Sequence, residues 1–69
     1  MSPPPPKIGE TVQIKEGWGY FFHDPIAFHR SHALDAPRAV VTAIKGQTCY
    51  LAFQNGRKGE ARLDAVRPA

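Results

Sequence analysis

The sequence is poor in cysteine, because Cys49 is the only one among its 69 residues. One cysteine cannot form a disulfide within the chain, which excludes a disulfide-stapled scaffold. The chain also lacks an apolar run as long as a signal-peptide core or a membrane span. These absences predict a cytoplasmic protein that does not enter a membrane. Cys49 is predicted to be a small buried apolar side chain, with a reactive or metal-bound thiol as the alternative.

The sequence lacks a long apolar pattern of helical period, whereas it contains seven prolines and six glycines. This composition favours short strands and turns. The length predicts one domain, over residues 8–67, near the size at which a single core is only just sufficient. A homo-oligomer or dependence on a partner is therefore expected. Residues 1–7 are predicted to be a disordered Pro-rich leader, and a ligand for an aromatic groove on another protein is the alternative.

Two strands are predicted on either side of Lys45-Gly46-Gln47, because β-branched and aromatic residues flank this short glycine-containing segment. A loop of two or four residues places alternate side chains of both strands on one face. It pairs Ile44 with Cys49, Thr42 with Leu51 and Val40 with Phe53 on that face. A slip of one residue would scatter these side chains. The register therefore predicts a core face that holds Val40, Ile44, Cys49, Leu51, Phe53 and Leu63.

The second turn contains Asn55-Gly56, the usual signature of a two-residue loop. Such a loop would place the charged residues of the next strand on the core face without partners, at a large cost in free energy. A three-residue loop, Gln54 to Gly56 with Gly56 left-handed, avoids this cost. The outward residues are then Lys58, Glu60 and Arg62, and the inward ones are Gly59, Ala61 and Leu63.

The segment of residues 18–36 is the least regular and most aromatic part of the chain. It follows a short predicted strand, Thr11 to Lys15, in which Val12 and Ile14 point inward. A connection of this length is predicted to contain an element of its own. Asp24-Pro25 has the form of a helix start, so a helix is predicted from Pro25 to about Ala33. One helical turn is predicted at residues 64–66.

This order of elements resembles the SH3-like small β-barrel, in which a long loop follows the first strand and a helical turn precedes the last. Residues 8–14, IGETVQI, also look like the first strands of KOW and Tudor-type modules. The resemblance covers residues 8–67 and concerns topology. It implies an all-β fold: a small five-stranded barrel with a long, partly helical loop between strands 1 and 2.

The net charge of +3 is unevenly distributed along the chain. Residues 1–37 contain three cations and four carboxylates, whereas residues 38–69 contain six cations and two carboxylates. A basic surface beside aromatic rings is typical of nucleic-acid binding through the phosphate backbone. Tyr50, Trp18 and Tyr20 are the candidate stacking platforms. The predicted nucleic-acid-binding residues are Lys45, Arg57, Lys58, Arg62, Arg67 and Tyr50.

The alternative is a non-enzymatic protein-interaction, regulatory or inhibitor module, since Trp, Tyr and Arg supply most interface anchors. Its partner-binding residues would be Trp18, Tyr20, Phe21, His23 and Arg30. His23, His29 and His32 are weak candidates for a metal site, because their spacing matches no zinc signature. The adjacent Ser31 and His32 do not make a catalytic triad, and a small barrel has little interior for a cleft. The sequence therefore predicts no enzyme and no cofactor.

Overall fold

The computed structural model of the chain describes residues 5–32 and 36–69. Strands and one turn of 3-10 helix make up its regular structure, so the predicted all-β class is confirmed. No helix among the described residues is long and apolar enough to cross a membrane. The elements are β1 (Thr11–Ile14), β2 (Gly19–Phe22), β3 (Ala27–Arg30), β4 (Arg38–Lys45), β5 (Thr48–Phe53), β6 (Lys58–Arg62), η2 (Leu63–Ala65) and β7 (Val66–Pro68).

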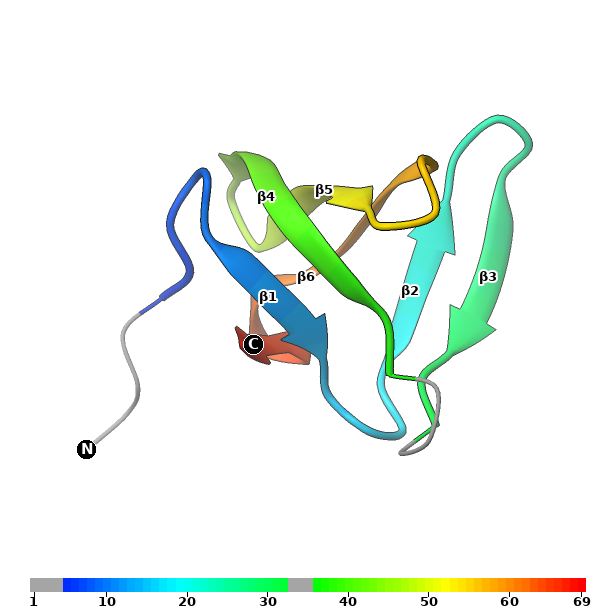
Figure 1. The fold of residues 1–69 in the computed structure, drawn as a ribbon, viewed down its shortest axis with the longest axis horizontal. Helices are drawn as coiled ribbons and strands as arrows, with labels where there is room; N and C mark the ends of the chain where they lie inside the picture. Colours follow the sequence, from blue (N-terminus) through cyan, green and yellow to red (C-terminus); the bar gives the residue numbers. More distant parts are fainter. Residues whose placement is uncertain (1–4, 33–35) are drawn as a thin grey trace.

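The strands form a single antiparallel sheet in the order β3-β2-β6-β5-β4-β1-β7. The sheet curls into a half-barrel and does not close, so β3 and β7 are its two edges (Figure 1). The prediction of a five-stranded barrel is therefore wrong in the number of strands and in closure. The extra strands come from the segment that was expected to be a loop.

The prediction of a helix over residues 25–33 is wrong for residues 25–32. Ala33 lies outside the described residues. Residues 19–30 form a hairpin instead, in which Phe21 pairs with Phe28. Asp24 takes a left-handed φ of 54° in the turn, and the Asp24–Pro25 peptide bond is cis. The helix-start signal at Asp24-Pro25 is local. Pairing of β2 with both β3 and β6 overrides it, because the ladder to β2 satisfies the backbone of residues 27–30 as a strand.

The β4–β5 hairpin confirms the predicted register only next to its turn. Ile44 pairs with Cys49 as predicted, but the register shifts between Val41 and Ala43. This bulge places one extra residue on β4 and reverses the parity of the strand beyond it. Val41 is consequently buried, whereas Val40 is 40% exposed and Thr42 faces solvent. The prediction that Val40 and Thr42 lie on the core face is wrong.

The β5–β6 turn has the predicted three-residue form. Gly56 is left-handed at φ 86°, and the Phe53 amide donates a hydrogen bond to the Arg57 carbonyl across the loop. Gly59 and Ala61 are buried on β6, as the parity argument required. The charged residues between and beside them face outward, so the cost of burying unpaired charges is avoided.

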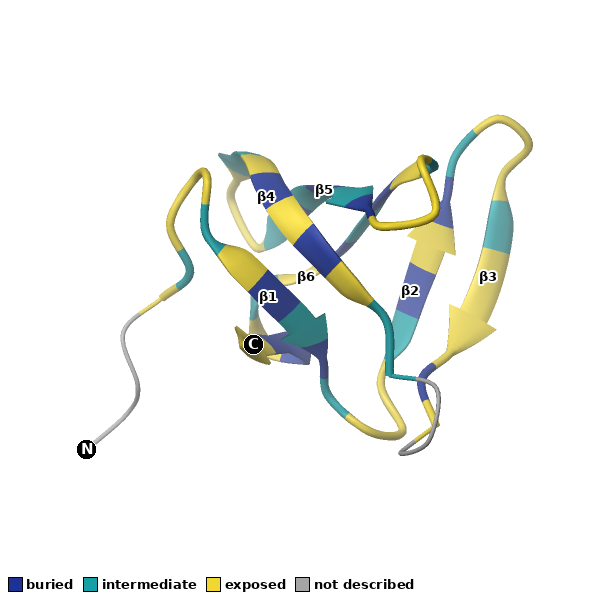
Figure 2. Cartoon of the chain, in the orientation of Figure 1, coloured by how far each residue is buried: buried dark blue, intermediate teal, exposed yellow. Residues whose placement is uncertain are grey.

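The core lies inside the curl of the sheet, and Figure 2 shows buried and exposed residues alternating along β4. Val12 and Ile14 are buried on β1 as predicted, and Leu63 is partly buried against the core. The helical turn η2 begins one residue earlier than predicted, and Val66–Pro68 then pairs with β1. The predicted leader, residues 1–7, lies mostly outside the described residues. The core residues are Val12, Ile14, Tyr20, Phe22, Ala39, Val41, Cys49, Leu51, Phe53, Ala61, Ala65 and Val66.

Cys49 is predicted to be chemically protected in the native protein. It has no exposed surface, and burial raises the pKa of its thiol because the thiolate would lose its hydration. The thiolate is the reactive form, so both effects slow modification. We expect a disulfide thiol reagent to label Cys49 at least about 100-fold more slowly in buffer than in urea. Equal labelling rates in the two solvents would contradict the buried position.

Candidate functional site

The pairing of β2 with β6 brings together residues that the sequence analysis assigned to two different functions. Phe21 lies opposite Glu60, Glu60 lies opposite Tyr50, and Phe28 lies opposite Phe21. Residues directly opposite on neighbouring strands share a face of the sheet. We call the side of β3, β2, β6 and β5 that bears these four residues the outer face. Predicted partner-binding and nucleic-acid-binding residues therefore lie on one surface.

Three partly exposed aromatic side chains surround a hollow in the outer face. Trp18, Phe21 and Phe28 are 38%, 42% and 49% exposed, although large apolar side chains are usually buried. The Phe21 and Phe28 rings pack edge to face with their centroids 5.0 Å apart. We call this feature, which has a volume of about 320 Å³, the aromatic hollow. It is lined by Trp18, Gly19, Phe21, Phe28, Thr48, Glu60, Ala61, Arg62 and Ala65.

Gly19 gives the aromatic hollow its shape. A Cβ atom at this position would lie only 2.5 Å from Cζ of Phe28 and 2.7 Å from Cε1. The missing side chain lets the Phe28 ring lie across β2 beside Phe21. Sequence reasoning did not single out Gly19. A glycine inside a strand often marks the close approach of a neighbouring group, and Gly19 could have been identified on this basis.

Cations lie near the exposed rings and near the half-buried ring of Tyr50. The Lys15 Nζ lies 5.6 Å from the centroid of the Trp18 ring, the Arg30 Cζ lies 6.0 Å from that of Phe28, and the Lys45 Nζ lies 5.9 Å from that of Tyr50. Cation–π attraction at exposed sites is weak, about 0.5–1 kcal/mol, so these side chains remain free to contact an anion.

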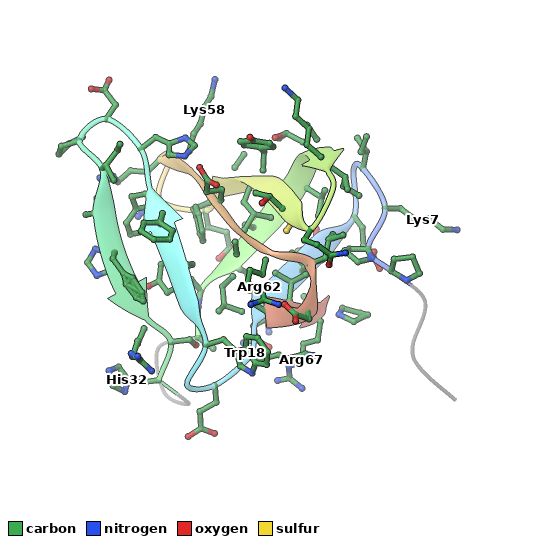
Figure 3. All side chains as sticks on the ribbon, turned by 180° about the vertical axis from the view of Figure 1, so that it is seen from behind. Lys7, Trp18, His32, Lys58, Arg62 and Arg67 are labelled. Carbon is green, nitrogen blue, oxygen red and sulfur yellow. The ribbon has the colours of Figure 1, made fainter. Side chains whose placement is uncertain are left out.

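Both ends of β6 add a cation to the outer face. Figure 3 shows Lys58 and Arg62 at opposite ends of this strand, with Arg62 close to Trp18. The guanidinium of Arg62 donates two hydrogen bonds to Asp64, at 3.1 and 3.0 Å. This bidentate contact holds Arg62 at the rim of the aromatic hollow. Lys58 is exposed.

One carboxylate lies within the outer face. The Glu60 Oε1 is 2.7 Å from the Nε2 of His23, and each of these side chains is 35% exposed. The His23 ring also lies 6.4 Å from that of Tyr50, measured between centroids. His23 therefore orients Glu60 between the aromatic hollow and Tyr50.

Three predicted site residues have other positions or contacts. Arg57 packs on Phe22, with its Cζ 4.2 Å from the ring centroid, and donates a hydrogen bond to the Pro25 carbonyl. Arg67 donates a hydrogen bond to the Gln13 side chain on β1. Tyr20 is only 8% exposed and belongs to the core. The outer face does not include these three side chains.

The three histidines are not brought together. His29 stacks on Tyr20 with centroids 5.7 Å apart, His23 contacts Glu60, and His32 is exposed. Within residues 5–32 and 36–69, no group of three His, Cys, Asp or Glu residues is arranged to hold a metal ion.

The functional assignment rests on the geometry and chemistry of the outer face. Its aromatic rings offer stacking and apolar contact, and its cations offer contacts to anions. The chain was compared with known protein families, with curated proteins and with solved structures, and none of them matches it.

Proposed function

We propose that this protein is a non-enzymatic module that binds single-stranded nucleic acid across its outer face. The observation that supports this function best is the placement of exposed or half-buried aromatic rings next to cations: Trp18 with Lys15, Phe28 with Arg30, and the half-buried Tyr50 with Lys45. Proteins that bind single strands combine aromatic platforms for the bases with cations that follow the phosphate backbone.

The geometry favours a single strand over a duplex. The exposed rings stand on a sheet, where an unstacked base can lie against them, whereas the bases of a duplex are stacked on one another. We assign the stacking contacts to Trp18, Phe21, Phe28 and Tyr50. Lys45, Lys58 and Arg62 are assigned to the phosphates. Arg57 and Arg67 lie off the outer face and are given no role here.

We also propose that the half-barrel is an open variant of the SH3-like small barrel. The order β7-β1-β4-β5-β6 supports this assignment, together with the helical turn η2 immediately before β7. The hairpin of β2 and β3 then occupies the place of the long loop after the first strand. In this arrangement, the outer face combines a barrel surface with the surface of that hairpin.

A test of this function measures the binding of a fluorescently labelled oligothymidylate and an oligouridylate by anisotropy at two salt concentrations. The double variant Lys45→Glu/Lys58→Glu is expected to bind at least tenfold more weakly. Removing two phosphate contacts should also reduce the slope of log affinity against log salt by about 1.4. Phe21→Ala is expected to weaken binding roughly tenfold, since one stacked base contributes about 1–3 kcal/mol.

The matched control is Lys7→Glu/Arg38→Glu, which makes the same change in net charge. Figure 3 shows Lys7 at the right margin of the view, apart from Lys58, Arg62 and Trp18, and Arg38 contributes to a separate hollow beside Phe53. The control should retain at least half of the wild-type affinity. Equal losses in both double variants would show non-specific charge attraction, and no binding by the wild type would refute the proposal.

A second candidate function is binding of a protein segment in the aromatic hollow. The specific observation is that Trp18, Phe21 and Phe28 line the hollow next to the carboxylate of Glu60, which would repel a phosphate. Exposed apolar hollows of this kind often receive apolar side chains of a partner. Binding that persists in high salt, fails with Phe21→Ala and survives Lys45→Glu/Lys58→Glu would favour this candidate.

A further inference from the structure

Strand β3 leaves one side of its backbone open. It is first in the sheet order, so it pairs with β2 on one side, and no strand among the described residues pairs with the other. Figure 1 shows β3 at the margin of the molecule. An open strand edge presents unpaired N–H and C=O groups to any chain that can add a strand.

The register identifies the backbone groups that point away from β2. The Ser31 amide donates a hydrogen bond to the Trp18 carbonyl at 3.0 Å, so this pair is of the hydrogen-bonded type. Hydrogen-bonded and non-hydrogen-bonded pairs alternate in an antiparallel ladder. His29 and Ala27 therefore bond to β2. The N–H and C=O groups of Phe28 and Arg30 face outward.

The two edges of the sheet differ in protection. At the β7 edge, Pro68 has no N–H to offer, and the Ala69 amide is already bonded to the Thr11 carbonyl. Strand β3 has no proline, lysine or bulge, three of the devices that protect an edge, although it is short and carries the charged Arg30. Ile26, in the turn before β3, is 78% exposed, and Phe28 is 49% exposed. The less protected edge and the exposed apolar surface therefore coincide.

We propose that β3 of a second copy of this chain adds antiparallel to this edge, giving a dimer with two-fold symmetry. The symmetric register centred on His29 places Phe28 opposite Arg30 of the partner subunit, and Arg30 opposite the partner's Phe28. Every outward N–H and C=O group of these two residues then finds a partner, as an antiparallel ladder requires. The two sheets become one continuous sheet.

The side chains fit a second copy in this register. Phe28 and Arg30 share a face, and the Arg30 Cζ already lies 6.0 Å from the centroid of its own Phe28 ring. Pairing with the partner places each cation beside a second ring and avoids direct opposition of like charges. The two His29 side chains meet on the opposite face, where each stacks on its own Tyr20.

The small size of the chain supports association with a second copy. A chain of about 60 residues buries only about 60% of the surface of its unfolded form, so association adds burial that the monomer lacks. The dimer would also join the outer faces of the two copies, with the Phe21–Phe28 row of each copy continuing into Arg30 of the partner subunit. Dimer formation does not depend on nucleic-acid binding, so the two proposals can fail separately.

The test uses Arg30→Pro, which removes the outward N–H of β3. Arg30 lies opposite Gly19 in a non-hydrogen-bonded pair, so the substitution spares the hydrogen bonds to β2. Sedimentation equilibrium from micromolar to millimolar concentration should show a monomer–dimer equilibrium for the wild type. Arg30→Pro should weaken association at least tenfold. The control Arg30→Ala keeps the backbone N–H and should still dimerise. Its association should be weakened less than that of Arg30→Pro.

Circular dichroism establishes whether Arg30→Pro is folded. If it is not, amide hydrogen exchange on the wild type decides instead, because Phe28 and Arg30 should become more protected as concentration rises. The proposal is overturned by a wild type that stays monomeric at millimolar concentration. It is equally overturned by a folded Arg30→Pro variant that dimerises like the wild type, or by protection at these two amides that does not depend on concentration.

Discussion

Replacing Gly59 with alanine is expected to lower the free energy of unfolding by about 3 kcal/mol, the upper range for overpacking. An added Cβ would collide with the backbone carbonyl oxygen of Phe21 and would lie 2.8 Å from Cε2 of Phe53. The Phe21 carbonyl belongs to β2 and cannot move without disturbing the β2–β6 pairing. Gly59 is therefore needed where the hairpin of β2 and β3 joins the rest of the sheet.

Gly19→Ala is the matched control for Gly59→Ala. The nearest atoms to a Cβ at Gly19 belong to the side chain of Phe28, which is partly exposed on an edge strand and can rotate away. We expect the free energy of unfolding of Gly19→Ala to fall by less than about 1 kcal/mol. Urea unfolding followed by Trp18 fluorescence and circular dichroism measures both variants. Equal stability of the two variants would contradict the close approach of β2 and β6.

Phe53→Ala is expected to lower the free energy of unfolding by about 3–5 kcal/mol. Phe53 is 5% exposed, and its ring centroid lies 4.9 Å from that of Phe22 and 5.5 Å from that of Tyr20. The ring therefore packs the end of β5 against β2. Native domains are stable by only about 5–15 kcal/mol, and small ones lie at the low end, so much of the variant should be unfolded at 25 °C.

Phe28→Ala is the corresponding control on the outer face. It removes the same side chain from a position that is 49% exposed, where the ring contacts Phe21 and covers Gly19. The free energy of unfolding is expected to fall by about 1 kcal/mol, because Phe28 buries less apolar surface in the folded protein than Phe53 does. Thermal unfolding by calorimetry compares the two variants. A Phe53→Ala protein with the stability of Phe28→Ala would show that the aromatic cluster does not hold β2 in place.

Local patterns predicted the β5–β6 hairpin because the alternative turn would have a large cost in free energy. A two-residue loop at Asn55-Gly56 would have turned Lys58, Glu60 and Arg62 into the core, and burial of unpaired charges excludes this. The bulge in β4 was not predictable in this way. Val40 and Val41 are equally apolar, so composition does not decide which of them points inward. The register shift between Val41 and Ala43 turns Val41 inward.

The residues 19–30 show the limit of local signals most clearly. Asp24-Pro25 has the form of a helix start, and nothing in the neighbouring residues reveals that β2 will pair with β6, far along the chain. The candidate site depends on the same long-range pairing. Tyr20 was assigned to a partner surface together with Phe21, yet alternation along β2 buries the first and exposes the second.

The sequence by itself determined the all-β class, the inward rows of β1, β5 and β6, and the presence of cations and aromatic rings, because these follow from side-chain polarity and strand period. Only the tertiary structure decided that Phe28, Phe21, Glu60 and Tyr50 lie in one row and that β3 is an open edge. The reason is physical: strand pairing between distant segments is selected by the packing of the whole core, and no local preference encodes it.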